Sequence, residues 1–286
     1  MSRQGKVWLV GAGPGDVGLF TIKGKDILAK AEVVVYDSLV GDGVLTMVPE
    51  NAEKINVGKR AGHHTMKQEN INKVLLEKAQ EGKRVVRLKG GDPFLFGRGG
   101  EELELLCEHK IPYEVVPGVT SCIAVPAYNG IPVTHRDFCS SVHVITGHKR
   151  AGESYNIDFE ALVRTKGTLV FLMGITAMED ICKGLLEAGM DPETPAAVLQ
   201  QGTTAGQKRV VATVNTLKQA STPYPESASS YQKHSERILL KILMWRVFFH
   251  NRCELHSRKV FHRQNGASFP GKPGRQWMDS TVAACS

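Results

Sequence analysis

The sequence predicts an α/β protein built from two α/β domains. Short apolar runs alternate with helical segments through the first half, which is the pattern of a parallel sheet covered by helices. After Pro117 and Gly118 the pattern changes, and the last two apolar runs are joined only by a polar turn, which favours a mixed sheet. We therefore expect one domain over residues 1–117, a second over residues 118–217 and an atypical basic tail over residues 218–286.

The first half contains five apolar runs of strand length, at residues 7–13, 31–37, 53–59, 83–92 and 113–118. The segments between them include three with apolar residues at helical spacing, at residues 21–31, 67–83 and 100–110. The clearest is the second of these, in which Ile71, Val74, Leu75 and Ala79 share one face. Strands and helices therefore alternate as βαβ units require.

The second half contains four further strand-like runs, at residues 141–149, 167–174, 195–202 and 208–216. One strongly periodic helix is expected between them, at residues 176–189. Because a short turn can join only antiparallel strands, the last two runs should pair antiparallel.

Composition and charge exclude several classes of partner. Residues 1–217 carry 25 Lys+Arg and 25 Asp+Glu, so the net charge of +7 is confined to the tail and does not indicate nucleic-acid binding by the body. No apolar run reaches the roughly 18–20 residues that cross a bilayer. The chain passes from MSRQGK into a strand without a signal peptide, so we expect a cytoplasmic protein. The six cysteines show no C-x-x-C spacing, and we expect no metal site.

The first strand ends in a glycine-rich turn, GAGPGDVG, in which Gly13, Gly15 and Gly18 fit G-x-G-x-x-G. Asp37 ends the next strand at about the spacing of the acid that binds a ribose hydroxyl, so an NAD-dependent oxidoreductase is one hypothesis. Pro14 inside the turn and Asp16, a negative charge where a phosphate would approach, weaken it.

Four strand ends carry glycine with polar partners: GAGPGD, VGKRAG, KGGDPF and PGVTS. Ligands of open α/β sheets bind outside the carboxyl ends of the strands. Several such ends directed at one cleft predict a ligand enclosed by backbone. S-adenosylmethionine, with its sulfonium cation, ribose and adenine, fits such a site.

The same segments resemble the tetrapyrrole (porphyrin/corrin) C-methyltransferase family. The resemblance lies in GAGPGD, VVVYDSLV, VGKRAG, VVRLKGGDPFLFGRGGEE, VVPGVTS, GIPVTHRD and TLVFLMG, and it covers about residues 5–217. It implies two α/β domains that form a homodimer, with S-adenosylmethionine in the cleft between the domains. It also implies a cofactor site that consists of Pro14, Gly90, Gly91, Asp92, Leu95, Phe96, Thr120, Ser121, Met173 and Gly202.

The resemblance further implies methylation of uroporphyrinogen III at two ring carbons, giving precorrin-2 through precorrin-1 for siroheme or cobalamin synthesis. Asp37 and Lys59 match the positions of the base and the acid, although Asp37 could instead cap the segment after its strand and Lys59 could be a surface cation. The substrate carries several carboxylates, so cations near the site are candidate ligands for them. The substrate-binding candidates are Arg60, Tyr128, His135 and Arg136. Another corrin-pathway methylase and an inactive tetrapyrrole-binding protein remain alternatives.

The chain departs from the family pattern after Leu217, where related chains continue with a helix and an apolar strand. Three hypotheses cover the tail. It could hold a basic amphipathic helix at residues 237–250, residues 238–249 could replace the missing strand, or the reading frame could shift near codons 217–221. Because the chain starts at the first strand, we also expect no dehydrogenase/chelatase module before it.

Overall fold

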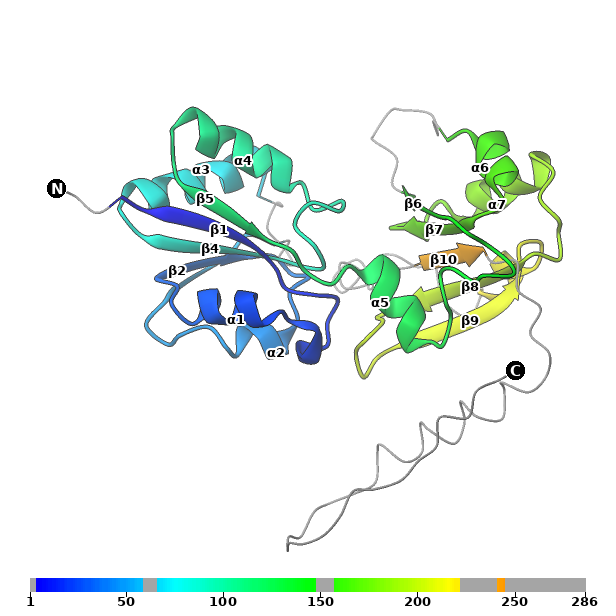
Figure 1. Cartoon of the computed structure of the whole chain (residues 1–286), viewed down its shortest axis with the longest axis horizontal. Coiled ribbons are helices and arrows are strands. Elements are labelled where there is room, and N and C mark those ends of the chain that lie inside the picture. The colour runs from blue at the N-terminus through cyan, green and yellow to red at the C-terminus, as the bar shows by residue number, and fades with distance from the viewer. Residues whose placement is uncertain (1–3, 59–65, 148–156, 222–240, 245–286) are drawn as a thin grey trace, which may run out of the picture. The chain divides into compact units, whose positions relative to one another are not determined.

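The structure is a computed structural model, and it describes residues 4–58, 66–147, 157–221 and 241–244 (Figure 1). Residues 1–246 form one compact unit, and the second unit, residues 247–286, lies outside the described residues. The first unit contains two five-stranded sheets with their helices, which confirms the predicted α/β class.

The first sheet consists of parallel strands in the order β3-β2-β4-β1-β5. The strands are β1 (Lys6–Gly11), β2 (Val33–Tyr36), β3 (Glu53–Asn56), β4 (Arg84–Lys89) and β5 (Tyr113–Val116). They match the five predicted runs. β2 and β4 are buried along nearly their whole length and β1 over most of it, and the apolar runs of β1 and β2 are accordingly continuous rather than alternating.

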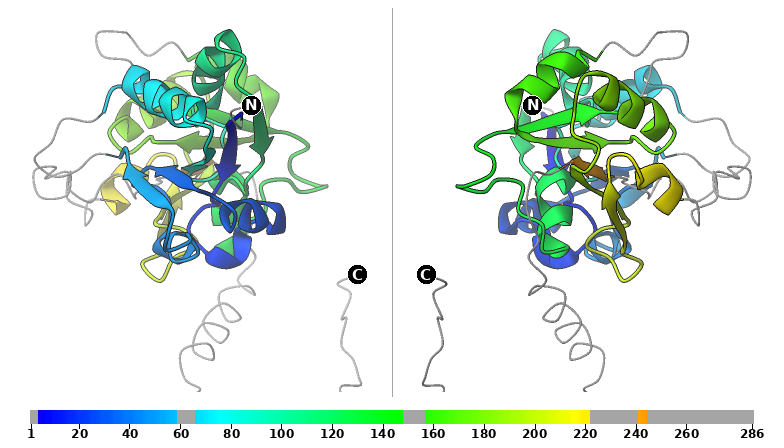
Figure 2. Two further views of the ribbon diagram at one scale, coloured as in Figure 1. Left: turned by 90° about the vertical axis from the view of Figure 1, so that its left-hand side faces the viewer. Right: turned by 90° about the vertical axis from the view of Figure 1, so that its right-hand side faces the viewer.

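Helices cover both faces of this sheet, and Figures 1 and 2 show the two layers. The helices are α1 (Ile22–Leu28) and α2 (Asp42–Leu45) on one face, and α3 (Gln68–Gln80) and α4 (Gly99–Glu108) on the other. Leu28 and Val44 belong to the core cluster of the first face, whereas Leu75 and Leu106 belong to that of the second. The one-turn 3₁₀ helix η1 (Val17–Leu19) precedes α1.

The order of the strands creates a topological switch point between β1 and β4. These neighbours are parallel, but the chain leaves β1 toward α1 on one face and leaves β4 toward α4 on the other. In open α/β sheets the loops diverge at such a point and leave a crevice at the carboxyl ends of the strands. The fold therefore places the loops after β1 and β4 at the most favourable position for a ligand.

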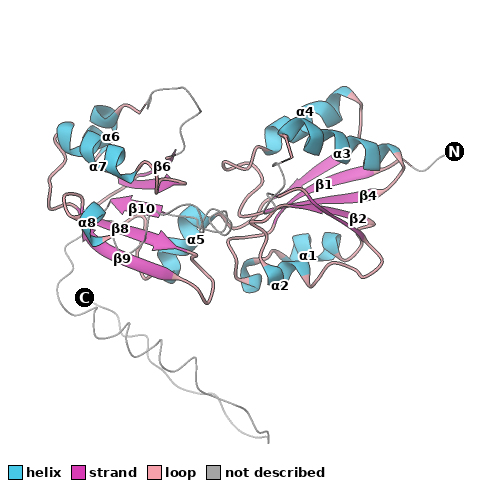
Figure 3. Ribbon diagram, turned by 180° about the vertical axis from the view of Figure 1, so that it is seen from behind, coloured by secondary structure: helices cyan, strands magenta, loops and turns pink. Residues whose placement is uncertain are grey.

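The second sheet is mixed, as predicted, with the order β6-β7-β10-β8-β9 (Figure 3). Its strands are β6 (Val142–Thr146), β7 (Thr168–Leu172), β8 (Pro195–Gln200), β9 (Lys208–Thr213) and β10 (Lys241–Met244). β6 and β7 are parallel, and β8 and β9 form the expected antiparallel pair.

The helices of the second half are α5 (Ser121–Tyr128), α6 (Phe159–Thr165), α7 (Met178–Glu187) and α8 (Leu217–Ala220). The predicted helix at residues 176–189 is α7, in which Met178, Ile181, Cys182 and Leu185 are buried at helical spacing. With Phe171 of β7 they form the core of this half.

The strand β10 comes from the tail and occupies the centre of the second sheet. It pairs antiparallel with β7 on one side and with β8 on the other. The hypothesis of a helix at residues 237–250 is therefore wrong for residues 241–244, because the backbone there pairs with two neighbouring strands. This strand agrees with the hypothesis that residues 238–249 replace the missing strand, while the frameshift stays untested.

Candidate functional site

Four loops meet at the carboxyl edge of the first sheet, those after β1, β2, β4 and β5. Three of them are predicted glycine-bearing strand ends, and most of the fourth predicted end, VGKRAG, lies outside the described residues. Gly13 and Gly91 exchange backbone hydrogen bonds, with N–O distances of 3.2 Å from Gly13 and 2.7 Å from Gly91. This pair joins the loops after β1 and β4 across the switch point. Asp92 Oδ2 accepts a hydrogen bond from Gly118 N at 3.0 Å, which adds the loop after β5. A Cβ on Gly90 would lie 2.5 Å from Leu39 Cβ, so the loop after β2 is in contact as well.

Gly90 and Gly91 are adjacent, but a glycine is needed at each position for a different physical reason. Gly90 is required by the close approach of Leu39. Gly91 has φ +69°, a left-handed conformation that strains other residues, but the nearest atom to an added Cβ is Ser121 N at 4.0 Å. The space beside Gly91 is therefore open, whereas Gly90 is packed against its own chain. A second glycine pair, Gly99 and Gly100, begins α4.

The side chain of Asp92 shapes the loop in which it lies. Its Oδ1 accepts hydrogen bonds from Phe94 N at 2.8 Å and Leu95 N at 3.1 Å, in addition to the bond of Oδ2 to Gly118. These bonds give Asp92 a structural role that the sequence did not reveal. Its predicted contact with a cofactor remains a prediction.

Backbone strain and exposed apolar side chains gather in the predicted cofactor-binding segments. Non-glycine residues with left-handed φ include Phe96 (53°), Met173 (58°) and Thr203 (65°). Such conformations persist where the surroundings enforce them, often at functional sites. Phe94, Leu95, Phe96 and Met173 are also exposed, and the first three are consecutive in the chain, so they can offer apolar contacts to a ligand.

The loop after β1 is tied to the second half through Asp16. Its Oδ2 accepts a hydrogen bond from Tyr128 Oη at 2.8 Å, and its backbone N donates to Thr203 Oγ1 at 3.2 Å. The bond to the carboxylate raises the pKa of Tyr128. Pro14, the predicted cofactor contact in this loop, is buried. A carboxylate at this turn is unfavourable for a pyrophosphate, which weakens the dinucleotide hypothesis.

Three further predicted cofactor residues, Thr120, Ser121 and Gly202, lie at the start of α5 or just after β8. Thr120 caps α5, its Oγ1 accepting from Cys122 N at 3.4 Å, and Ser121 is buried in the first turn. Gly202 follows β8 and packs against Val125 of α5.

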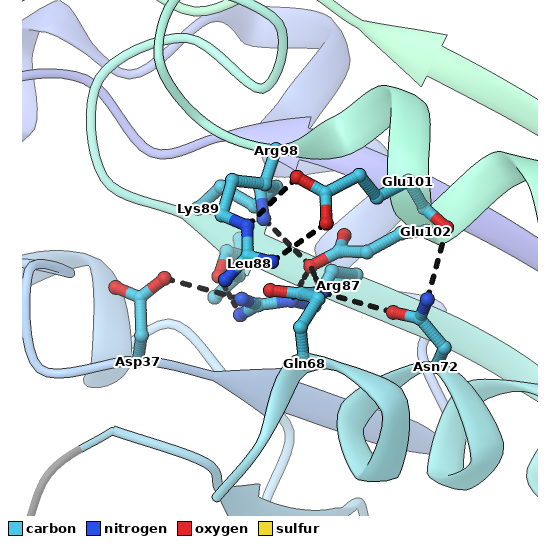
Figure 4. Close-up of polar contacts among 9 residues, drawn as sticks. All are labelled: Asp37, Gln68, Asn72, Arg87, Leu88, Lys89, Arg98, Glu101 and Glu102. Carbon is cyan, nitrogen blue, oxygen red and sulfur yellow. Dashed lines mark hydrogen bonds and ion pairs between the residues drawn. The ribbon is translucent and has the colours of Figure 1, made fainter. Parts of the chain in front are cut away.

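Asp37, the predicted base, follows β2 directly and has a partner on each oxygen. Its Oδ1 accepts from Leu39 N at 3.0 Å, the local cap that the sequence allowed as an alternative. Its Oδ2 accepts from Arg87 Nη2 at 3.3 Å (Figure 4). The Asp37 side chain is 23% exposed. The cap and a functional role are therefore compatible.

Behind Asp37 lies a buried charge cluster, Arg87, Lys89 and Glu102, that the sequence analysis missed. Glu102 Oε1 accepts from Lys89 Nζ at 2.7 Å and from Arg87 Nε at 3.2 Å. Burial lowers the pKa of Lys89, and the positive charge of Arg87 acts in the same direction. The available signal was two cations two residues apart, Arg87 and Lys89, in the buried part of a strand.

Of the substrate-binding candidates, Tyr128, His135 and Arg136 lie among the described residues, and their role remains a prediction. His135 and Arg136 lie in a tight loop in which His135 N donates to Cys139 O at 3.1 Å, and the His135 ring lies 4.8 Å from that of Phe138. Lys59 and Arg60 lie outside the described residues, so the predicted acid has no structural account.

Metal-binding clusters and membrane-spanning helices are both absent from the described residues. Within residues 4–58, 66–147, 157–221 and 241–244, no cluster of three or more His, Cys, Asp or Glu side chains is arranged to bind a metal. In the same residues, no helix has the length and hydropathy needed to cross a membrane.

Comparison with known proteins gives relatives along most of the chain. A porphyrin biosynthesis protein HemD of Ruminiclostridium josui is 58% identical over 217 residues, which is 76% of this chain and 43% of that protein. A siroheme synthase of Escherichia fergusonii is 51% identical over 217 residues, 76% of this chain and 47% of that protein. The chain thus spans less than half the length of these curated relatives.

Solved structures of methyltransferases share the fold of this chain. The uroporphyrin-III C-methyl transferase from Thermus thermophilus, complexed with S-adenyl homocysteine, superimposes with a TM-score of 0.68 at 39% identity, covering 84% of this chain and 97% of that one. The cobalt precorrin-4 methyltransferase CbiF gives a TM-score of 0.70 at 30% identity, covering 84% and 94%. The family model of the tetrapyrrole (corrin/porphyrin) methylases matches residues 6–218, close to the extent of the resemblance found in the sequence. The chain therefore belongs to the tetrapyrrole methylase family.

Proposed function

We propose that this protein is an S-adenosylmethionine-dependent C-methyltransferase that methylates uroporphyrinogen III at two ring carbons, giving precorrin-2 through precorrin-1. Support comes from the family and from the Thermus thermophilus relative, whose name states its activity on uroporphyrin III and whose structure contains S-adenyl homocysteine. Siroheme synthases among the relatives favour a place in siroheme synthesis, and the relative that acts on cobalt precorrin-4 favours corrin chemistry.

The observation that carries this proposal is the junction of the loops after β1 and β4. Gly13 and Gly91 hold the two loops together, and the space beside Gly91 is open. Exposed Leu95 and Phe96 follow directly and offer apolar contacts. An adenosine with a charged sulfonium group fits such a site, which combines backbone groups, apolar faces and the Asp92 carboxylate.

S-adenosylmethionine supplies an electrophilic methyl group, and the residues of this chain supply alignment and proton transfer. The loop residues hold the two reactants in line and exclude water, which is the main contribution expected of the enzyme. As the new C–CH3 bond replaces the S–CH3 bond, the ring must lose one proton net, and Asp37 accepts it. Lys59 is the acid for tautomerisation of the ring, in which the proton it donates is matched by a second proton lost from the ring. Arg60, His135 and Arg136 bind substrate carboxylates through charge-assisted hydrogen bonds.

The test is an anaerobic incubation of the purified chain with uroporphyrinogen III and S-adenosylmethionine, followed by mass spectrometry. We expect a product with two added methyl groups. Binding of the tetrapyrrole without methyl transfer would instead indicate an inactive binding protein. Reduction of NAD, with no affinity for S-adenosylmethionine, would favour the oxidoreductase.

The homodimer and the cytoplasmic location remain predictions of the sequence analysis. Light scattering coupled to size exclusion measures the mass of the assembly, and a value near that of a single 31.3 kDa chain would contradict the dimer.

A further inference from the structure

We propose that Arg87 is a positioning residue that fixes the carboxylate of Asp37, and that Glu102 holds Arg87 in place for this task. The inference rests on the proposed function, in which Asp37 is the base. It concerns a residue that does not reach the ligand site and acts only through Asp37.

The guanidinium of Arg87 is fixed by contacts in three directions (Figure 4). Its Nε donates to Glu102 Oε1 at 3.2 Å, and its Nη1 donates to Leu88 O at 2.8 Å. The remaining nitrogen, Nη2, donates to Asp37 Oδ2 at 3.3 Å. Because the guanidinium is planar and rigid, the first two contacts determine where the third points.

The balance of buried positive and negative charges explains why Asp37 is part of the cluster. Arg87 and Lys89 are two cations with side chains only 3% and 5% exposed. Of the two carboxylates in contact with Arg87, only Glu102 is fully buried. Buried charges are costly unless they are paired. The second negative charge comes from Asp37, which is the only member of the four that is partly exposed, at 23%.

The two cations have different partners. Lys89 Nζ contacts Glu102 Oε1 at 2.7 Å, and the described contacts give it no bond to Asp37. Gln68 Nε2 also donates to this oxygen, at 3.2 Å, so Glu102 is anchored from α3 as well as from β4. Lys89 therefore mainly balances Glu102 and interacts with Asp37 only through its charge, whereas Arg87 bonds both Glu102 and Asp37.

The position of Arg87 in β4 connects Asp37 to the loop of the proposed cofactor site. β4 continues directly into Gly90 and Gly91, and Gly90 packs against Leu39, whose N–H binds the other oxygen of Asp37. A shift of Arg87 would thus displace the base relative to this loop. A misplacement of about 1 Å can cost roughly 100-fold in rate when reactants must be aligned.

The test compares two charge-balanced double variants. Arg87→Met/Glu102→Gln removes one cation and one anion and breaks the contact to Asp37. Lys89→Met/Glu102→Gln removes the same charges, but the amide oxygen introduced at position 102 can still accept the hydrogen bond of Arg87 Nε, so Arg87 stays held beside Asp37. Both are made in the wild-type and in the Asp37→Asn background, and melting temperature and S-adenosylhomocysteine affinity are measured with kcat.

We expect Arg87→Met/Glu102→Gln to lower kcat by roughly 10- to 100-fold without a matching change in S-adenosylhomocysteine affinity. In the Asp37→Asn background the same double change should cost no further activity, because Arg87 acts through Asp37. Arg87→Lys should not restore kcat, because an ammonium group cannot bond Glu102, Leu88 and Asp37 in this fixed geometry. The Lys89 control should retain kcat within severalfold.

Equal losses in the two double variants, or an undiminished loss in the Asp37→Asn background, would overturn the proposal and leave Arg87 a purely structural residue. A crystal structure separates this outcome from failure of the proposed base. Without Arg87 the Asp37 carboxylate should occupy more than one rotamer, whether or not Asp37 takes a proton. A single unchanged rotamer would refute the positioning role.

Discussion

Gly91 shows how one backbone angle supports the loop junction. Its φ of +69° is unfavourable for residues with a Cβ, although no atom lies closer than 4.0 Å to the place of that Cβ. We expect Gly91→Ala to lower the free energy of unfolding by about 1–3 kcal/mol through backbone strain alone. Gly100→Ala is the matched control, because it lies in the first turn of α4 with nothing within 4 Å and should stabilise by about 0.5–1 kcal/mol. Urea unfolding measures both, and changes of the same sign would contradict the argument.

Asp37 is the residue whose chemical role is most specific. We expect Asp37→Asn to lower kcat by about 10²–10⁴-fold, the usual contribution of a positioned acid or base. Affinity for S-adenosylhomocysteine, measured by calorimetry, should stay nearly constant because the loops that bind it are unchanged. Asp26→Asn, the same change on the exposed surface of α1, serves as the control. Equal losses of turnover and of affinity would show that Asp37 supports the site rather than the reaction.

At the scale of elements, Glu114 joins β5 to α1 and to β1. Its carboxylate lies 2.6 Å from Lys23 Nζ and 2.8 Å from Lys6 Nζ. The hydrogen bond from Lys23, followed by that from Lys6, lowers the pKa of Glu114 from 4.5 to about 2. Because the folded-state pKa is depressed, the stabilisation is present above the ordinary pKa and is lost as the pH falls toward 2.

The variant Glu114→Gln tests this link between elements. We expect it to lower the free energy of unfolding at neutral pH by less than about 1 kcal/mol, since the group is partly exposed. The difference from the wild type should shrink as the pH falls below about 4.5, which unfolding curves at several pH values measure. A difference that does not depend on pH would mean that the side chain acts through packing.

The strand β10 makes a sharper prediction, because a central strand cannot be lost without exposing two others. A chain that ends at Ser221 leaves the edges of β7 and β8 unpaired, whereas a chain that ends at Arg246 retains β10. We expect the shorter chain to lose more than about 4 kcal/mol of unfolding free energy or to aggregate. The longer chain should unfold like the full chain. Equal stability of the two truncated chains would show that the second sheet does not depend on β10.

At the scale of the whole molecule, ligand binding should stabilise the fold by mass action. A ligand at 100 times its dissociation constant adds about 2.7 kcal/mol, which for a chain of this size raises the melting temperature by roughly 5–10 °C. We expect S-adenosylhomocysteine to produce this increase in thermal unfolding and NAD to produce none. Stabilisation by NAD and none by S-adenosylhomocysteine would instead favour the dinucleotide hypothesis.

Much of this architecture was predictable because the signals are local. Helical spacing, as in the buried stripe of α7, predicted α1, α3, α4 and α7, and apolar runs ending in glycine or polar turns predicted β1 to β9. The helices α2, α5, α6 and α8 were not predicted. The cluster of Arg87, Lys89 and Glu102 was not predictable, because β4 and α4 bring these charges together only after they pack. β10 was ambiguous, since the apolar residues 238–249 suit a helix or a strand and tertiary pairing decided between them.

The central place of β10 also has a consequence for biosynthesis. A ribosome releases the chain from its N-terminus, so all strands of the first sheet exist once Val116 has emerged. The second sheet stays incomplete much longer, because β7 ends at Leu172 and β8 at Gln200, but the strand between them begins at Lys241. During that interval the nascent chain carries two open strand edges, the kind of surface that promotes misassembly. The second half is therefore where slow translation or a shortage of chaperones would first reduce the yield of native protein.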